Sequence, residues 1–325
     1  MATLEDVAKR AGCSVATASR ALNDKDLVSD RFRRRVSKAA VELGYRASVQ
    51  ASGRSARRPV VGVLIPSITN PVFATSVSII QNRMLMAGHG VLIAQSNYDP
   101  AQERDAIAAL LNEHPTGLIL TLCNSEESTL PLRQMPHTVL LHNRPTQRFP
   151  SAVTADNRAA GYEITKHLYA RGHRDILFVS GRFSASDRAR SRYLGYCAMM
   201  QEAGLKVPAA LEIGFVEFDR LELGEVMRTS RPTAIVASND LLALAVISAL
   251  RREGLSVPGD VSVAGFDGIA IGRMIDPILT TIEMPDVTMG AAAASLLLDI
   301  AENDAPARHL EIPFTLRQGG TVRSI

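Results

Sequence analysis

The chain has 325 residues, more than one hydrophobic core usually supports, so we expect two or three domains. Hydrophobic residues make up 46% and charged residues 21% of the sequence, ordinary values for a soluble globular protein. Cys13, Cys123 and Cys197 are few and far apart, which excludes a disulfide framework or a zinc-binding spacing and favours a reducing cytoplasm.

The net charge of +3 hides an asymmetry along the chain. Residues 1–58 hold 13 basic and 6 acidic side chains, whereas the other residues hold 23 basic and 27 acidic ones. A basic head on a mildly acidic body favours phosphate contact by the head alone, and a solvated charged surface is the simpler alternative.

The sequence shows no segment typical of export or of a membrane. The N-terminus begins a capped helix rather than a basic segment followed by an apolar run, so we expect no secretory signal. The most apolar stretch, Met289 to Ile300, contains Asp299 and is too short to span a bilayer, which favours a buried helix.

The N-terminal segment predicts three short helices. Thr3 can cap the first, and a Gly-Cys turn leads to a second that opens on Ser14. The third runs from Ser29 or Asp30 to about Leu43 and ends at a glycine. Small or polar side chains line the exposed face of the second helix. This is the build of a helix-turn-helix, whose second helix enters the major groove of DNA.

A linker and a different pattern follow. Residues 46–59 are small, polar and basic, and they are either a passive tether or a segment that orders against DNA. From Val60 onward strands alternate with helices, which predicts parallel sheets with helices on both faces. Two sets of strands indicate two similar lobes, with strands expected at 60–65, 90–94, 117–122, 138–141 and 152–155, and then at 176–180, 213–218, 234–237, 261–266 and 279–282.

Polar residues gather where the predicted strands end. Ligands of such sheets bind at the carboxyl ends of the strands, which makes these positions the candidate binding site. Asn, Asp, Ser and Arg side chains hydrogen-bond hydroxyls and carboxylates, as a sugar-like ligand requires, although Asn and Asp are also common in turns. The strand ends concerned are 66–70, 96–99, 142–144, 156–157, 238–240 and 265–267.

With these features in place, the chain resembles the lactose/galactose-repressor (LacI/GalR) family of bacterial transcription regulators over nearly its whole length. The segment from Thr3 to Asn23 looks like the signature of that family. Residues 64–70 and 272–277 are similar to gluconate-type repressors within it. Further landmarks are Leu43-Gly44-Tyr45, Arg171-Gly172-His173-Arg174, Ser238-Asn239-Asp240 and Val263-Ala264-Gly265-Phe266-Asp267.

The resemblance implies an all-α helix-turn-helix headpiece and an α/β core like that of periplasmic sugar-binding proteins, made of two doubly wound parallel-sheet lobes. It implies a homodimer, with a tetramer left open, that represses transcription from a near-palindromic double-stranded operator. It also implies a small-molecule effector between the lobes: a sugar acid, sugar or sugar phosphate. The implied boundaries are 1–46 for the headpiece, 47–59 for the hinge and 60–325 for the core, with an N-lobe of about 60–158 plus 286–310 and a C-lobe of about 159–285 plus 311–325.

The resemblance places Val15, Ala16 and Arg20 where family members present side chains to base edges. Arg20 can donate two hydrogen bonds to guanine, and its alternatives are a phosphate contact or a surface salt bridge. The linker lacks the leucine that the family wedges into the minor groove, so we expect Arg54 to act there by charge, without a sharp kink. The predicted DNA-contacting residues are Thr3, Leu4, Ser14, Val15, Ala16, Thr17, Ser19, Arg20, Asn23 and Arg54.

We expect Arg192 to anchor the effector, because guanidinium binds carboxylate or phosphate in a forked geometry. Each aromatic in the predicted site has core packing as its alternative, and Asp267 has a turn cap. The other predicted contacts are Asn239 and Asp267 in the second lobe and Asn70, Phe73, Tyr98, Asn143 and Arg144 in the first.

Two other classes of protein are alternatives at this point. A periplasmic sugar-binding protein shares the two-lobed core but has no use for residues 1–45. A Rossmann-type enzyme needs a Gly-rich turn after the first strand, where this chain has Pro66 to Asn70 and no phosphate cradle. The sequence shows no catalytic triad, no paired carboxylates and no metal spacing among its seven histidines, so we expect neither catalysis nor a cofactor.

Overall fold

The computed structural model describes residues 2–23, 29–43, 45, 58–128, 135–215 and 217–325. They divide into two compact units, 1–57 and 58–325. Residues 46–57, which include most of the predicted hinge and Arg54, lie outside the described residues.

The N-terminal unit is a three-helix bundle, as the sequence predicts, with α1 (Leu4–Ala11), α2 (Val15–Asn23) and α3 (Asp30–Glu42). Thr3 and Asp6 form a reciprocal cap on α1, because each side chain accepts a hydrogen bond from the other residue's backbone N–H. Gly12 ends α1 in the left-handed region, with a φ of 60°. The shared core consists of small apolar side chains: Val7, Ala8, Ala11, Ala18, Ala21, Val36, Ala39 and Ala40.

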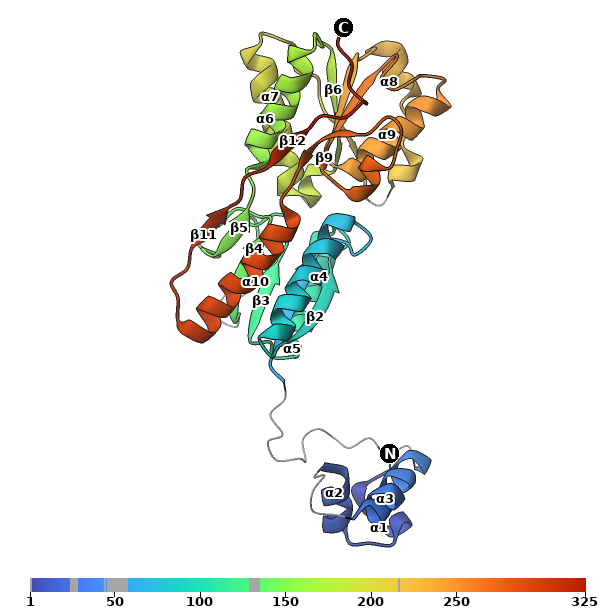
Figure 1. The fold of residues 1–325 in the computed structure, drawn as a ribbon, viewed down its shortest axis with the longest axis vertical. Coiled ribbons are helices and arrows are strands. Elements are labelled where there is room, and N and C mark those ends of the chain that lie inside the picture. Colours follow the sequence, from blue (N-terminus) through green and yellow to red (C-terminus); the bar gives the residue numbers. More distant parts are fainter. Residues whose placement is uncertain (1, 24–28, 44, 46–57, 129–134, 216) are drawn as a thin grey trace. The chain divides into compact units, whose positions relative to one another are not determined.

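The first lobe of the larger unit, the N-lobe, is a parallel sheet in the strand order β11-β5-β4-β3-β1-β2. Helices α4 and α10 cover one face and α5 covers the other (Figure 1). Its strands are β1 (Val60–Ile65), β2 (Gly90–Gln95), β3 (Gly117–Leu120), β4 (His137–Leu141), β5 (Ala152–Thr154) and β11 (His309–Glu311), and its helices are α4 (Pro71–Met86), α5 (Pro100–Asn112) and α10 (Asp286–Asn303).

The second lobe, the C-lobe, is a sheet in the strand order β12-β10-β9-β8-β6-β7. Helices α6 and α7 pack on one face, and α8 and α9 on the other (Figure 1). Its strands are β6 (Ile176–Gly181), β7 (Leu211–Ile213), β8 (Ala234–Ala237), β9 (Ser262–Asp267), β10 (Thr280–Glu283) and β12 (Thr315–Arg317). Its helices are α6 (Asn157–Ala170), α7 (Asp187–Glu202), α8 (Gly224–Thr229) and α9 (Asp240–Arg252). The lobe also has three short 3-10 helices, η2 (Phe183–Ala185), η3 (Phe218–Arg220) and η4 (Ala270–Arg273).

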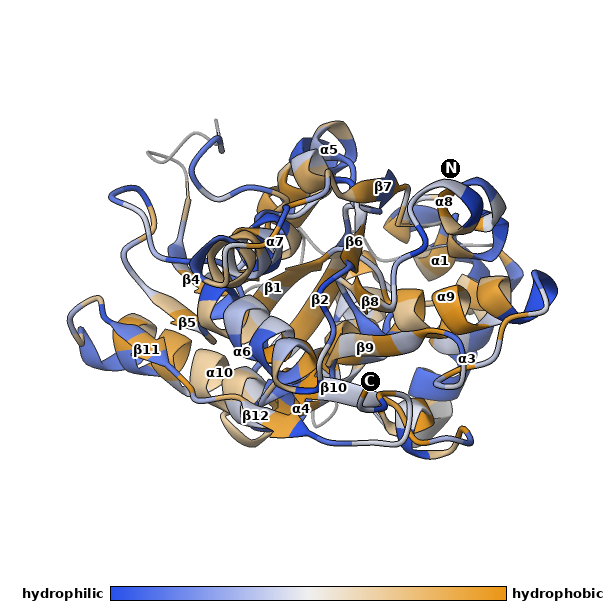
Figure 2. Cartoon of the chain, turned by 90° about the horizontal axis from the view of Figure 1, so that it is seen from above, coloured by the Kyte–Doolittle hydropathy of each residue, from blue (hydrophilic) through white to orange (hydrophobic). Residues whose placement is uncertain are grey.

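Both sheets have their cores along the central strands. Strands β3, β6, β8 and β9 are buried along their whole length, as a parallel sheet covered on both faces requires. Figure 2 shows β9, for example, in the apolar colour among helices of mixed hydropathy. Among the described residues no helix has the length and apolar composition of a bilayer span.

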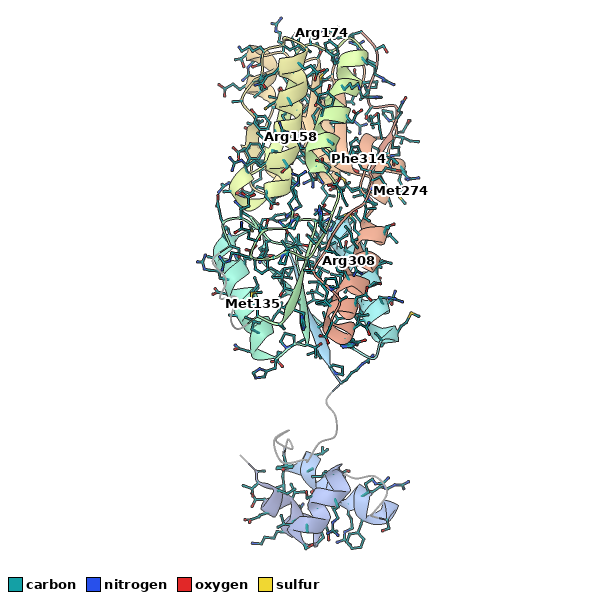
Figure 3. All side chains as sticks on the ribbon, turned by 90° about the vertical axis from the view of Figure 1, so that its left-hand side faces the viewer. Met135, Arg158, Arg174, Met274, Arg308 and Phe314 are labelled. Atoms are coloured by element: carbon teal, nitrogen blue, oxygen red, sulfur yellow. The ribbon has the colours of Figure 1, made fainter. Side chains whose placement is uncertain are left out.

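The chain crosses between the lobes three times, from β5 to α6, from β10 to α10 and from β11 to β12. Figure 3 labels Arg158 and Phe314 close to the first and the last of these crossings. Each lobe is therefore assembled from segments that are distant in the sequence, and the strand ends of both sheets face the same interlobe space.

Two details differ from the expected elements. The predicted strand 213–218 is wrong: β7 covers Leu211–Ile213, and the chain then turns because Glu217 N donates to the Gly214 carbonyl oxygen. The C-lobe sheet is not wholly parallel, since β12 pairs antiparallel with β10. Strand β12 has three residues and no apolar run, so the sequence pattern gave no signal for it.

Candidate functional site

The exposed face of α2 begins at Ser14, whose hydroxyl accepts from Thr17 N at 3.1 Å and so caps the helix. Val15 is 42% exposed although it is apolar, and Ala16 and Arg20 are exposed beside it. Ala18 and Ala21 point into the bundle core. The helix thus presents its N-terminal end and one guanidinium to solvent.

The other residues of the predicted DNA-contacting set have different places. Thr3 is exposed but is used in the α1 cap, and Leu4 packs against the bundle core. Thr17 and Ser19 are half-buried. Asn23 is the last residue of α2.

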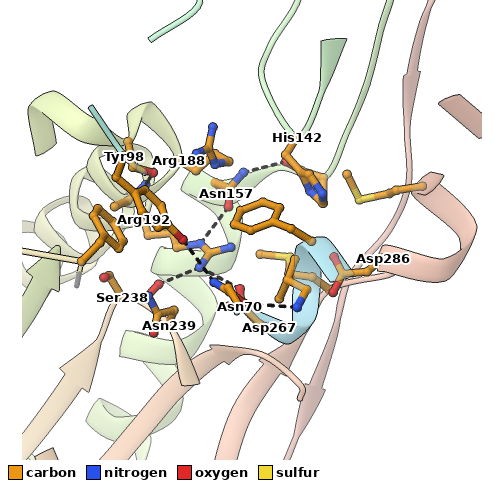
Figure 4. Close-up of a pocket in the computed structure, with 18 residues that line it drawn as sticks. Asn70, Tyr98, His142, Asn157, Arg188, Arg192, Ser238, Asn239, Asp267 and Asp286 are labelled. Carbon is orange, nitrogen blue, oxygen red and sulfur yellow. Dashed lines mark hydrogen bonds and ion pairs between the residues drawn. The ribbon is translucent and has the colours of Figure 1, made fainter. Parts of the chain in front are cut away.

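A cavity of about 40 Å³ lies between the lobes, at the carboxyl ends of the strands (Figure 4). This volume holds a few water molecules and is too small for a sugar. Six residues singled out from the sequence line it, namely Asn70, Phe73, Tyr98, Arg192, Asn239 and Asp267. Asn143 and Arg144 are absent from its lining.

Arg192 of α7 is the most connected side chain in the cavity. Its Nη1 donates to the Ser238 carbonyl oxygen at 2.6 Å and to Asp267 Oδ1 at 3.0 Å, and its Nε donates to Asn157 Oδ1 at 2.8 Å. Arg192 and Asp267 are each only 8% exposed. Burial raises the pKa of Asp267, and the neighbouring Arg192 charge opposes this. Arg192 therefore joins α6, α7, β8 and β9 into one rigid wall.

Close packing of α6 on α7 fixes the position of that wall. A Cβ added at Gly161 would collide with the Arg192 carbonyl oxygen, and one at Gly195 would collide with the Arg158 carbonyl oxygen. Glycine at both positions lets the two helix backbones approach each other closely.

An aromatic contact crosses between the lobes beside the cavity. Tyr98 of the N-lobe stacks on Phe215 of the C-lobe, with ring centroids 4.0 Å apart and an interplanar angle of 5°. Asn70 caps α4 by accepting from Val72 N, and its Nδ2 donates to the Tyr98 hydroxyl at 3.2 Å. Burial raises the pKa of Tyr98 to about 12, so the hydroxyl keeps its proton. Asn239 likewise caps α9.

Asn143 contacts the opposite lobe instead of the cavity. Its Nδ2 donates to the two Asp187 carboxylate oxygens at 3.0 and 2.8 Å, and Asp187 N donates to the Cys123 carbonyl oxygen at 2.9 Å. Arg188 Nη1 donates to the Leu122 carbonyl oxygen at 2.8 Å. We call these contacts between the N-lobe and the start of α7 the interlobe latch. Arg144, by contrast, is exposed.

Sequence reasoning gave no role to several cavity residues, among them His142, Arg188 and Asp286. His142 belongs to a strand end already flagged as polar, and burial lowers its pKa to about 3, so the ring is neutral. Arg188 and Asp286 lie in the first turns of α7 and α10, where the strand-end pattern gives no signal. Within the described ranges, no group of three or more His, Cys, Asp or Glu residues is arranged to hold a metal ion.

Two family models match the chain. "Bacterial regulatory proteins, lacI family" matches residues 3–48, and "Periplasmic binding protein-like domain" matches residues 165–322. The headpiece match separates the chain from a solute-binding protein, which would need only the core.

Relatives of similar length match both units. The transcriptional regulator DegA of Bacillus subtilis is 33% identical over 89% of this chain and 88% of its own. The transcriptional regulator GntR of Escherichia coli is 32% identical over 98% of both chains. A solved LacI family transcriptional regulator from Silicibacter pomeroyi is 25% identical over 81% of this chain and 98% of its own, with a TM-score of 0.72. The chain therefore belongs to the lacI family of bacterial regulatory proteins, and it is a ligand-responsive, DNA-binding transcriptional regulator rather than an enzyme.

Proposed function

We propose that this regulator is a cytoplasmic repressor that binds a near-palindromic operator as a homodimer, under the control of a sugar-like effector, a sugar acid such as gluconate being favoured. The observation that carries the proposal is the exposed face of α2. An apolar Val15 and a small Ala16 stand in solvent beside an exposed Arg20. Such a face can contact the edge of a base and a thymine methyl group, whereas its apolar side chains gain nothing from contact with water.

In this proposal Arg20 donates to a guanine, and Val15 and Ala16 contact thymine methyl groups or leave room for them. Thr17 and Ser19 serve phosphate contacts or packing. Thr3, Leu4, Ser14 and Asn23 complete the contact set in the headpiece. Arg54 belongs to the linker, where its charge favours the minor groove.

A second copy of this chain is the proposed partner for the edge of the N-lobe sheet. Strand β2 is an edge strand that carries Ile93 at 44% exposure, and the neighbouring α4 ends with the exposed Leu85 and Met86. An edge strand with exposed apolar side chains favours pairing with another chain. A dimer places two headpieces on two half-sites one helical turn apart.

The proposed effector site is the interlobe cavity, with Asn70, Phe73, Tyr98, Arg192, Asn239 and Asp267 among its contacts. The cavity of about 40 Å³ cannot accept a sugar while the lobes are as close as they are here. Binding is therefore coupled to a change in the angle between the lobes, and the effector shifts the population of arrangements that hold the headpieces at operator spacing.

Selection of binding sites from random double-stranded DNA by the full chain tests the proposal. We expect a palindromic motif, an affinity that falls steeply with salt, and loss of one base preference in Arg20→Ala. Arg10→Ala is the matched control, because it removes the same charge from a guanidinium that is paired with Glu42 at 2.9 Å. No salt-sensitive binding to any fragment, or an unchanged motif in Arg20→Ala, would overturn the proposal.

A further inference from the structure

Three residues that line the interlobe cavity each carry one buried polar atom without a hydrogen-bond partner among the described residues. The atoms are Arg188 Nη2, His142 Nε2 and Asp286 Oδ1. They come from the first turn of α7, the end of β4 and the first turn of α10. Buried polar groups are nearly always paired, so three unpaired atoms around one cavity indicate a ligand that pairs them.

The two arginines of the cavity differ in how their unused nitrogen is placed. Arg192 serves three acceptors through Nε and Nη1, including the Asp267 carboxylate, and its Nη2, which has no partner among the described residues, is not buried. Arg188 uses Nη1 for the Leu122 carbonyl oxygen at 2.8 Å and for its neighbour Asp187 at 3.2 Å, while Nη2 has no acceptor. A buried guanidinium nitrogen without an acceptor is costly, and an anionic group relieves that cost most fully.

The local environment of Arg188 also favours an anion. Arg188 lies in the first turn of α7, a 16-residue helix, and Ser186 and Ala189 from the same turn line the cavity with it. The N-terminal end of a helix carries partial positive charge, which adds to the guanidinium charge. The other cation among the described residues that line the cavity is Arg192, which is paired with Asp267, and the His142 ring is neutral.

Asp286 occupies another wall, away from Arg188 (Figure 4). Its Oδ1 is buried and unpaired, and burial together with Asp267 raises its pKa well above the usual value for a carboxyl group. A carboxyl group accepts a hydrogen bond from a ligand hydroxyl in either protonation state, and its ionised form repels an anion. The two walls therefore differ in the ligand chemistry they accept.

We propose that Arg188 Nη2 binds the anionic group of the effector while Asp286 binds a hydroxyl at its other end, so that the cavity selects polyhydroxy acids over neutral sugars. This inference rests on the proposed effector site. It assigns the acid selectivity to Arg188 and leaves Arg192 as part of the wall.

Calorimetry on the full chain with matched pairs of compounds tests the assignment. The probes are five- and six-carbon aldonates and uronates with their neutral counterparts, for example gluconate with glucitol and glucuronate with glucose. We expect an acid to bind about ten- to hundredfold more tightly than its neutral partner, the range for one charged hydrogen bond. Arg188→Gln should reduce that ratio to about twofold or less, and Arg188→Lys should retain part of it.

Matched variants separate selectivity from folding and closure. Arg190→Gln removes the same charge from an exposed position two residues along α7 and should leave the acid-to-neutral ratio unchanged. Asp286→Asn should weaken both members of a pair by about three- to tenfold without changing their ratio. Because the ratio compares two ligands on one variant, a variant that merely closes poorly loses affinity for both and keeps the ratio.

Each outcome decides the assignment. A wild-type preference for the neutral partner, no binding by any acid, or an intact ratio in Arg188→Gln overturns the role of Arg188. Unchanged affinities in Asp286→Asn overturn the hydroxyl contact. If a neutral sugar releases or recruits DNA, this inference is refuted and the proposed function is retained. If the chain does not bind DNA, the proposed function itself is refuted.

Discussion

Replacing Asp267 by asparagine tests how strongly the buried ion pair holds the wall of the cavity. Arg192 and Asp267 meet at 3.0 Å, and both side chains are about nine-tenths buried. Asparagine has the same shape, so the substitution removes the negative charge without leaving a hole. The Arg192 charge then stays buried, with only neutral acceptors around it.

Removing one partner of a buried ion pair typically costs about 3–5 kcal/mol of unfolding free energy. Asparagine keeps one carbonyl oxygen as an acceptor, so a neutral hydrogen bond of about 1 kcal/mol remains and offsets part of this cost. The contacts with Asn157 and Ser238 also remain. We therefore expect Asp267→Asn to destabilise the core by about 2–4 kcal/mol.

Urea unfolding followed by circular dichroism measures this loss on the full chain. The matched control is Asp299→Asn, because Asp299 pairs with Arg308 at 2.6 Å with both side chains about 40% exposed. An exposed pair is worth less than about 1 kcal/mol, so the control should shift the midpoint little. Equal midpoint shifts for the two variants would refute the argument that burial determines how much an ion pair contributes to the unfolding free energy.

Three further predictions concern packing, the latch and pH. Gly161→Ala should lower the unfolding free energy by about 1–3 kcal/mol, because the new methyl group forces α6 away from α7; thermal unfolding measures it. Asp187→Ala removes the acceptor of Asn143 across the lobes, so the ligand-free core should open and its radius of gyration in X-ray scattering should rise. Below pH 6.5 the unfolded chain protonates His142 while the folded chain, with a pKa of about 3, does not. The contribution of His142 to the unfolding free energy should therefore fall by up to about 1.4 kcal/mol per pH unit as the pH drops from 6.5 towards 3. Comparing the wild type with His142→Gln in urea unfolding at pH 7 and pH 5 isolates this contribution from the opposite one of Asp240, whose pKa is raised to about 8.

Each of these has a control in the same region. Lys166→Ala places alanine on the exposed side of α6 and should cost little, so a loss equal to that of Gly161→Ala would contradict the packing argument. Arg190→Gln should leave the scattering of the core unchanged, and an Asp187→Ala core as compact as the wild type would contradict the latch. His142→Gln should lose part of the acid sensitivity, whereas His137→Gln, at an exposed position, should retain it; the reverse result would reject the pH argument.

The alternation of strands and helices was enough to predict the fold, because each buried parallel strand is a nearly continuous apolar run. Strands β1, β8 and β9 lie within a residue of their expected bounds. The pattern failed where a strand is short or half-exposed. Three-residue strands such as β11 and β12 have no run to detect, and Gly214 diverts the chain where apolar residues continue past β7.

The cavity was only partly predictable, since a strand end fixes a region but not the direction of each side chain. Three consecutive residues after β4 show this: His142 lines the cavity, Asn143 contacts the opposite lobe and Arg144 lies in solvent. Arg188 and Asp286 reach the cavity from helix starts, through the docking of one lobe on the other. That docking depends on contacts between segments far apart in the sequence, and no local pattern encodes it.

The same guanidinium belongs to both the latch and the cavity. Arg188, which lines the cavity, donates from Nη1 to the Leu122 carbonyl oxygen in the N-lobe, and its Nη2 is buried without a partner. A planar guanidinium cannot turn one nitrogen without moving the other. An anion that draws Nη2 therefore changes the geometry of a contact between the lobes directly. If the effector anion binds Arg188 as proposed, ligand charge and lobe angle are coupled through this one side chain.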